Sequence, residues 1–134
     1  MTSEDRPVET VGVLTVDDHP QFRRMARRVV EATPGFELLG EASSGEEAIP
    51  LADTLDPDLI LLDVRMGGID GVETARRLHA THPDAVIVLV STERAAGESA
   101  VAGTCGAAAF LPKQELGAPA LQRLWTAHRH PSPL

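Results

Sequence analysis

The sequence predicts an α/β fold in which a parallel sheet lies between two layers of helices. Short apolar segments alternate with segments whose apolar residues recur every three or four positions, which is the spacing of a helix face. The central apolar segment, Leu59 to Leu62, shows no polar alternation, as expected for a strand covered on both faces. Five strand–helix pairs within 134 residues indicate one domain built as a three-layer sandwich.

The first part of the chain predicts two strands around one helix. The first strand covers Val11 to Val16 and ends at the acidic pair that follows it. Pro20 is suited to the first turn of a helix, and Pro34–Gly35 ends that helix. The second strand covers Phe36 to Ala42. The helix has an apolar stripe at Phe22, Met25, Ala26, Val29 and Val30.

The middle of the chain predicts two helices around the central strand. The run from Ser44 to Glu47 has the pattern of a capping box that opens the second helix, which we expect Pro50 to kink or shorten. The strand Leu59 to Leu62 ends at Asp63. Asp70, with a glutamate three residues later, indicates another capping box, and the helix it opens extends to about Thr81.

The last part predicts a strand from Ala85 to Val90, a weak helix from Ala95 to Thr104, a strand from Ala108 to Leu111, and a final helix. Right-handed crossovers favour the flavodoxin-like strand order 2-1-3-4-5 with five helices. Ligands in such sheets bind beyond the carboxyl ends of the strands, near the first and third. We expect residues 1–10 to be a flexible segment, 11–129 the domain and 130–134 a tail. The final helix carries an apolar face made of Leu121, Leu124, Trp125 and His128.

Composition narrows the functional classes. The net charge of -8 argues against direct nucleic acid binding by this chain. The single cysteine, Cys105, cannot form an internal disulfide, which fits a reducing compartment. Because the chain has no signal-peptide pattern and no apolar run of the ~20 residues needed to span a bilayer, we expect a cytoplasmic protein without a membrane segment.

Polar residues follow the strands at one edge of the expected sheet. Asp17 and Asp18 follow the first strand, Asp63 the third, Ser91 the fourth and Lys113 the fifth. Three carboxylates in one crevice repel one another and favour a divalent cation, for which Mg²⁺ with oxygen ligands is the best candidate. A carboxylate nucleophile, a metal and donors to phosphoryl oxygens are the parts that phosphoryl transfer needs.

The same residues carry a resemblance to a known family. The runs Val16–Pro20, Leu61–Met66, Ile69–Gly71 and Phe110–Lys113, together with Ser91, resemble the signature of CheY-like receiver domains of two-component response regulators. Each motif alone is weak, whereas their order and their positions at four strand ends make the joint signal strong. The resemblance covers the chain from about residue 11 to residue 128.

The resemblance implies a role for each residue. Asp63 is the phosphoacceptor; Asp17, Asp18, Asp63 and the backbone carbonyl of Arg65 hold Mg²⁺; Ser91 and Lys113 bind the phosphoryl group; and Ser91 and Phe110 form the switch. The implied donor is a sensor histidine kinase or a phosphotransfer protein, and a homodimer is left open. The protein would be a signalling phosphoacceptor that assists its own phosphorylation and dephosphorylation, and not an enzyme with a separate substrate. Phosphorylation would alter the face formed by the fourth helix, fifth strand and fifth helix.

Two neighbours of this site are given simpler roles. His19, beside the acidic pair, is expected to precede Pro20 at the helix start and not to bind metal. The arginines of the first helix are expected on a solvated face, with recognition of a kinase left open.

Several alternatives remain at this stage. An FMN-binding protein would share the fold, but Asp17 and Asp18 would repel its phosphate. Many aspartyl phosphatases carry an acid two residues after the nucleophile, where this chain has Arg65. Within the receiver family, a stand-alone receiver is preferred to the excised regulatory domain of a DNA-binding transcription factor, because the chain ends close to the last helix. A phosphorylation-independent interaction or dimerisation domain is the third option.

Overall fold

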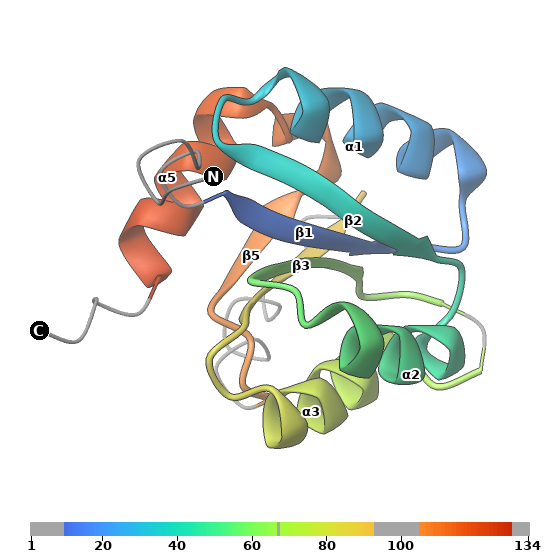
Figure 1. The fold of residues 1–134 in the computed structure, drawn as a ribbon. Helices are drawn as coiled ribbons and strands as arrows, with labels where there is room; N and C mark the ends of the chain where they lie inside the picture. The colour runs from blue at the N-terminus through green and yellow to red at the C-terminus, as the bar shows by residue number, and fades with distance from the viewer. Residues whose placement is uncertain (1–9, 67, 93–104, 130–134) are drawn as a thin grey trace, which may run out of the picture.

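A five-stranded parallel sheet forms the centre of the molecule (Figure 1). The computed structural model describes residues 10–66, 68–92 and 105–129. The strand order is β2-β1-β3-β4-β5, so the predicted flavodoxin-like order is confirmed. The strands are β1 (Val11–Val16), β2 (Phe36–Ala42), β3 (Leu59–Asp63), β4 (Val86–Ser91) and β5 (Ala109–Pro112).

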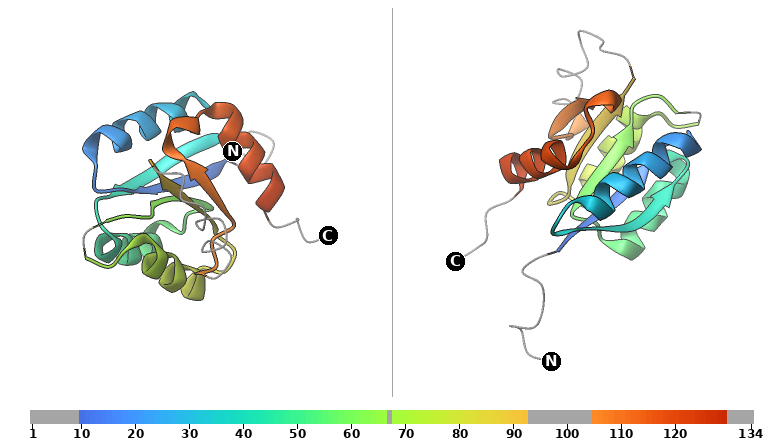
Figure 2. Two further views of the ribbon diagram at one scale, coloured as in Figure 1. Left: turned by 180° about the vertical axis from the view of Figure 1, so that it is seen from behind. Right: turned by 90° about the horizontal axis from the view of Figure 1, so that it is seen from above.

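Helices cover both faces of this sheet, which confirms the three-layer arrangement. Helices α1 and α5 lie on one face, and α2 and α3 lie on the other (Figures 1 and 2). The described residues contain four α-helices and a short 3-10 helix, η2 (Lys113–Glu115), whereas the predicted helix from Ala95 to Thr104 lies outside them. The α-helices are α1 (Pro20–Ala32), α2 (Gly45–Leu55), α3 (Gly71–Thr81) and α5 (Ala118–His128). The division of the chain at residues 11 and 129 stays a prediction.

The apolar core is divided by the sheet into two clusters. In β3, Leu59 and Leu61 face the cluster of α1 and α5, whereas Ile60 and Leu62 face the cluster of α2 and α3. All four side chains are almost fully buried. Because β3 is buried on both faces, polar side chains are confined to its ends, and Asp63 lies at the carboxyl end.

Helix α2 begins as predicted and continues past its internal proline. Ser44 Oγ accepts a hydrogen bond from the backbone N–H of Glu47 at 3.1 Å, while the Glu47 carboxylate accepts one from the backbone N–H of Ser43. The cap therefore reaches one residue further back than a standard capping box. The helix continues past Pro50 to Leu55, so Pro50 does not end it, and the alternative expectation of a kink stays a prediction. Pro50 removes only the hydrogen bond that would reach the carbonyl of Glu46.

Helix α3 begins against the end of β3. Asp70 Oδ1 accepts a hydrogen bond from the Glu73 backbone N–H at 2.9 Å, which caps the helix, but the Glu73 carboxylate binds two arginines of its own helix and does not reach back. The Gly71 N–H donates to the carbonyl of Val64 at 2.9 Å. A Cβ atom at position 71 would collide with the carbonyl oxygen of Asp63. Glycine is therefore required for this close approach.

Candidate functional site

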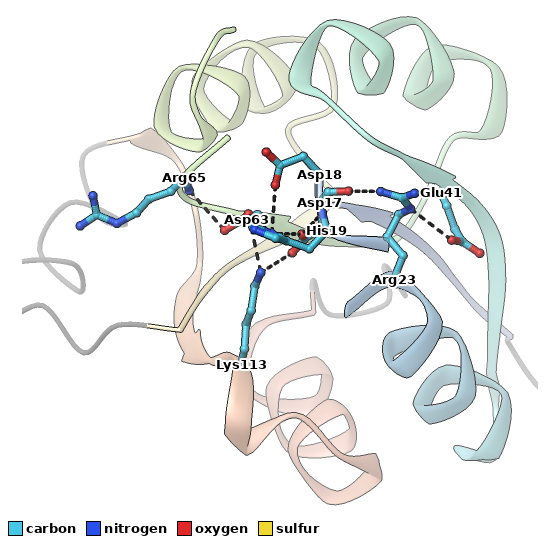
Figure 3. Close-up of polar contacts among 8 residues, drawn as sticks. All are labelled: Asp17, Asp18, His19, Arg23, Glu41, Asp63, Arg65 and Lys113. Carbon is cyan, nitrogen blue, oxygen red and sulfur yellow. Dashed lines mark hydrogen bonds and ion pairs between the residues drawn. The ribbon is translucent and has the colours of Figure 1, made fainter. Parts of the chain in front are cut away.

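The predicted acidic residues do come together at the carboxyl edge of the sheet. Strands β1 and β3 are paired in parallel, with Val16 opposite Leu62, so Asp17 and Asp18 lie next to Asp63. One oxygen from each carboxylate and one ring nitrogen of His19 all lie within 4.8 Å of one another. Figure 3 shows these four side chains converging above the strand ends, with Lys113 approaching from below.

Lys113 enters the site from η2, directly after β5, and is almost buried. Its Nζ lies 2.6 Å from Asp17 Oδ2 and 3.6 Å from Asp63 Oδ2. The same ammonium lies 4.5 Å from the centroid of the Phe22 ring, within the range of a cation–π contact. A buried cation is stable only when it is paired, and here two carboxylates and an aromatic face supply the pairing.

Asp63 is a buried carboxylate with an incompletely satisfied oxygen. Its exposed fraction is 3%, and its Oδ1 accepts a hydrogen bond of 3.2 Å from the Arg65 backbone N–H. Among the described residues, nothing donates a hydrogen bond to Oδ2. Burial, the largest cause, and the negative charge of Asp17 together raise the pKa of Asp63 to about 6, although the positive charge of Lys113 opposes the shift.

His19 occupies the centre of the carboxylate group, which its predicted role did not anticipate. It is the N-cap residue of α1, as expected for the residue before Pro20, but its side chain makes no capping hydrogen bond. Instead, Nδ1 lies 3.0 Å from Asp17 Oδ1 and 3.0 Å from Asp18 Oδ1 (Figure 3). In the sequence, the only indication of this contact is that His19 follows the acidic pair directly. The predicted role of His19 at the helix start explains the position of its backbone but not that of its ring.

Two of the α1 arginines have a structural role that the sequence analysis missed. Arg23 Nη1 donates to the backbone carbonyl of Asp17 at 2.5 Å, and Arg23 Nε lies 3.6 Å from a Glu41 oxygen. Arg27 Nε lies 2.7 Å from the other oxygen of Glu41. Glu41 in β2 therefore anchors α1 and, through Arg23, the backbone of the acidic pair (Figure 3). The sequence indicated this contact only through the position of Glu41 on a predicted strand beside the arginine-rich helix.

Ser91 and Phe110 are placed on the same face of the sheet. Ser91 ends β4, is buried, and pairs with Pro112 of β5, while Phe110 lies two residues before Pro112 in the same strand. Because residues two apart in a strand share a face, Ser91 and Phe110 are diagonal neighbours. Phe110 is half-buried against the cluster of α2 and α3. Ser91 lies one residue beyond Val90, the residue that pairs with Asp63.

The site opens into a groove beside α1. This cavity has a volume of ≈380 Å³ and is lined by His19, Gln21, Phe22, Met25, Thr92, Lys113 and Gln114. Its lining joins Lys113 to residues of the first turns of α1 and includes none of the three carboxylates.

The donor set fits a hard divalent cation. Carboxylate oxygens are the ligands that Mg²⁺ prefers, and Asp63 Oδ2 is a buried acceptor without a donor among the described residues. The like-charge repulsion that raises the pKa of Asp63 is also relieved by a bound cation. The Arg65 side chain points away from the carboxylates, so only its backbone is near enough to take part (Figure 3).

The comparisons with known proteins identify the family. The profile of the response regulator receiver domain matches residues 13–124. The receiver domain of the putative response regulator NarL from Mycobacterium tuberculosis has a similar structure, with a TM-score of 0.80, 31% identity, and coverage of 87% of this chain and 96% of that one. The chain belongs to the response regulator receiver domains of two-component systems.

The curated relatives are longer proteins. The nitrate/nitrite response regulator protein NarL of Escherichia coli (strain K12) is 38% identical over 105 residues, which are 78% of this chain and 49% of that protein. A protein-glutamate methylesterase/protein-glutamine glutaminase of Halalkalibacterium halodurans is 38% identical over 104 residues, 77% of this chain and 30% of that protein. The chain thus spans half or less of these relatives, and what they share with it is the receiver. No helix within the described residues has the length and hydrophobicity to cross a membrane.

Proposed function

We propose that this receiver accepts a phosphoryl group on Asp63 from the phosphohistidine of a sensor histidine kinase or a phosphotransfer protein. The observation that carries the proposal is the state of Asp63. It is 3% exposed, its Oδ2 accepts no hydrogen bond among the described residues, and the Lys113 ammonium lies 3.6 Å from that oxygen. Burying a carboxylate oxygen without a hydrogen bond costs free energy of desolvation. Such a cost is typical of residues that are kept for a function, and it therefore supports a functional role for Asp63.

The reaction would be an in-line transfer. An Asp63 carboxylate oxygen attacks the phosphorus, the P–N bond to the donor imidazole breaks, and the imidazole leaves with that electron pair. Attack requires the ionised carboxylate, and a pKa of about 6 leaves Asp63 mostly ionised at neutral pH. Lys113 would stabilise the negative charge of the phosphoryl oxygens, and the Ser91 hydroxyl would donate a hydrogen bond to one of them.

The proposed metal is Mg²⁺. Asp17, Asp18, Asp63 and the Arg65 carbonyl are the groups that would hold it, and the carboxylates among them converge in the structure. When bound, the ion neutralises charge on the phosphoryl oxygens during transfer. Arg23 keeps the Asp17 backbone in place through its 2.5 Å hydrogen bond, and so acts as a positioning residue for this group.

The groove beside α1 supports docking of the donor at this edge. It is lined by residues of α1 and by Lys113, whose ammonium lies 3.6 Å from Asp63 Oδ2, so a donor docked there would lie beside the phosphorylation site. Arg24 and Arg28 on the same helix are exposed and available to an acidic partner.

Ser91 and Phe110 are the proposed switch. Because they are diagonal neighbours on one face, a shift of Ser91 towards a phosphoryl group would open space for the Phe110 ring. The face formed by the predicted helix from Ala95 to Thr104, β5 and α5 would change in consequence, and this change would control an output. Two forms of the whole protein are compatible with this function: a stand-alone signalling protein, acting alone or as a homodimer, and a regulator that carries a DNA-binding domain. The matched relatives extend beyond the receiver.

The test is chemical phosphorylation of the purified protein. Incubation with phosphoramidate and Mg²⁺ should add one phosphoryl group, measured by intact mass, and Asp63→Asn should abolish the addition. Asp56→Asn is the matched control, because Asp56 is exposed at the opposite edge of the sheet and has a φ of 50°, which asparagine tolerates. The control should react like the parent. An adduct that persists in Asp63→Asn would contradict the assignment, and no adduct in the parent would favour a phosphorylation-independent domain.

A further inference from the structure

The His19 ring lies where an additional metal ligand would be. Its Nδ1 is 3.0 Å from Asp17 Oδ1, 3.0 Å from Asp18 Oδ1 and 3.7 Å from Asp63 Oδ2. The ring approaches from the solvent side, since the side chain is 64% exposed, whereas the Asp17 and Asp63 side chains are buried. In Figure 3 it lies between the three carboxylates.

The spacing of these atoms is that of donors sharing one ion. Ligands at about 2.1 Å from a six-coordinate ion are about 3 Å apart when they are neighbours in the coordination shell. The Nδ1 distances to Asp17 and Asp18 match this value, and the whole group lies within 4.8 Å. Asp63 Oδ2 is an independent sign of a ligand here, because it is buried and accepts no hydrogen bond among the described residues.

The backbone role of His19 does not explain the position of its ring. His19 is the N-cap residue of α1, yet its side chain makes no capping hydrogen bond. Its own N–H donates to Asp17 Oδ1 at 2.8 Å, which holds the residue beside the acidic pair. The exposed ring does not extend into solvent, because its Nδ1 is hydrogen-bonded to Asp17 Oδ1 at 3.0 Å, and this contact holds the nitrogen among the carboxylates.

We propose that His19 is a nitrogen ligand of the metal site and gives this receiver a raised affinity for borderline divalent ions, with Zn²⁺ as the representative. The proposal rests on the metal site of the proposed function and extends its ligand set. Carboxylate and carbonyl oxygens suit Mg²⁺, whereas imidazole suits Zn²⁺, Ni²⁺ and Cu²⁺. Adding one imidazole to an oxygen site therefore raises the affinity for Zn²⁺ far more than that for Mg²⁺. The site would respond to the supply of either ion.

Calorimetric titration of Mg²⁺ and Zn²⁺ into the protein tests the ligand role. The variant is His19→Asn, since asparagine is a good N-cap residue and preserves the helix start. We expect its Kd for Zn²⁺ to rise about tenfold or more, with the Kd for Mg²⁺ changed less than about threefold, as the loss of one ligand implies. His128→Asn, an exposed histidine at the far end of α5, should match the parent for both ions.

A second readout identifies the atom. Zn²⁺ should shift the Nδ1 resonance of His19 in a long-range ¹H–¹⁵N spectrum, and excess Mg²⁺ should reverse the shift. An unchanged or tighter Kd for Zn²⁺ in His19→Asn would overturn the proposal, since the ring would then be a bystander or a competitor of the ion. If the parent bound Zn²⁺ through His19 but not Mg²⁺, the Mg²⁺-dependent function would fail while the ligand role stood.

Discussion

The Lys113 ammonium is 2.6 Å from Asp17 but 3.6 Å from Asp63. The lysine therefore pairs most closely with the acid beside the proposed phosphoacceptor. The 3.6 Å separation leaves Asp63 Oδ2 without a hydrogen bond among the described residues. The three residues form one charge network, so the effects of their substitutions should be coupled.

Removal of the lysine should leave Asp17 buried without its cation. We expect Lys113→Met to lower the free energy of unfolding by roughly 3 kcal/mol, the usual cost of breaking a buried pair by removing one partner. Adding Asp17→Asn to this variant should recover part of the loss, since the uncompensated charge is then gone. Urea unfolding measures both. Arg123→Met, at an exposed position of α5, is the control and should change stability by less than about 0.5 kcal/mol. Additive effects of the two site substitutions would argue against the network.

The Phe22 ring should hold the ammonium in place. Phe22→Leu keeps an apolar side chain but removes the ring that lies 4.5 Å from Lys113 Nζ. A cation–π contact of about 1 kcal/mol corresponds to a roughly fivefold slower phosphorylation by phosphoramidate. The Kd for Mg²⁺ should not change. Lys113 is the only lysine in the sequence, so its ε-methylene protons can be identified directly by NMR, and they should move downfield when the ring current is lost.

The control for this variant is Phe36→Leu. Phe36 packs at the border of the same cluster in β2 and is not the aromatic ring over the ammonium. Its substitution should leave both the Lys113 resonance and the phosphorylation rate unchanged. A similar loss of rate in both variants would mean that Phe22 acts through general packing.

The raised pKa of Asp63 should appear as a pH-dependent stability. The folded state holds the Asp63 proton up to about pH 6, whereas the unfolded chain releases it near the ordinary value of 3.8. Folding is therefore favoured by Asp63 at low pH, and this contribution is lost as the pH rises from about 4 to 6. With EDTA present, Asp63→Asn should be more stable than the parent at pH 8, by on the order of 2 kcal/mol, and this advantage should shrink towards pH 4. A constant difference across this range would contradict the assignment.

Gly71 should be intolerant of even one methyl group. Gly71→Ala places a Cβ against the carbonyl oxygen of Asp63, so either the α3 start or the end of β3 has to move. We expect a loss of roughly 1–3 kcal/mol in thermal or urea unfolding and slower phosphorylation. Gly117→Ala is the matched control, because the nearest atom to its Cβ would be Pro119 Cδ at 3.8 Å. Equal stability of the two variants would show that the start of α3 and the end of β3 can move apart at little cost in free energy.

The strands and the residues at their ends could be predicted from the sequence because local patterns determine them. An apolar run such as Leu59 to Leu62 ends where a charge begins, and the pairing of parallel strands then brings Asp17, Asp18 and Asp63 to one edge. The continuation of α2 past Pro50 could not be predicted, because packing against the sheet holds the helix together across the missing hydrogen bond. The ring of His19 and the Arg23–Glu41 contact depend on side-chain placement between separate elements, which residue spacing does not specify.

The central claim is that Asp63 is the residue that carries the phosphoryl group. Borohydride reduces an acyl phosphate to an alcohol, so treating the protein after reaction with phosphoramidate and Mg²⁺ converts the phosphorylated aspartate into homoserine. Tandem mass spectrometry of the peptide from residues 29 to 65 then reports which acid reacted. Homoserine at position 63, dependent on Mg²⁺ and missing from the untreated protein, is the predicted result. Homoserine at any other position, or an unmodified peptide from protein that had gained the phosphoryl mass, would contradict it.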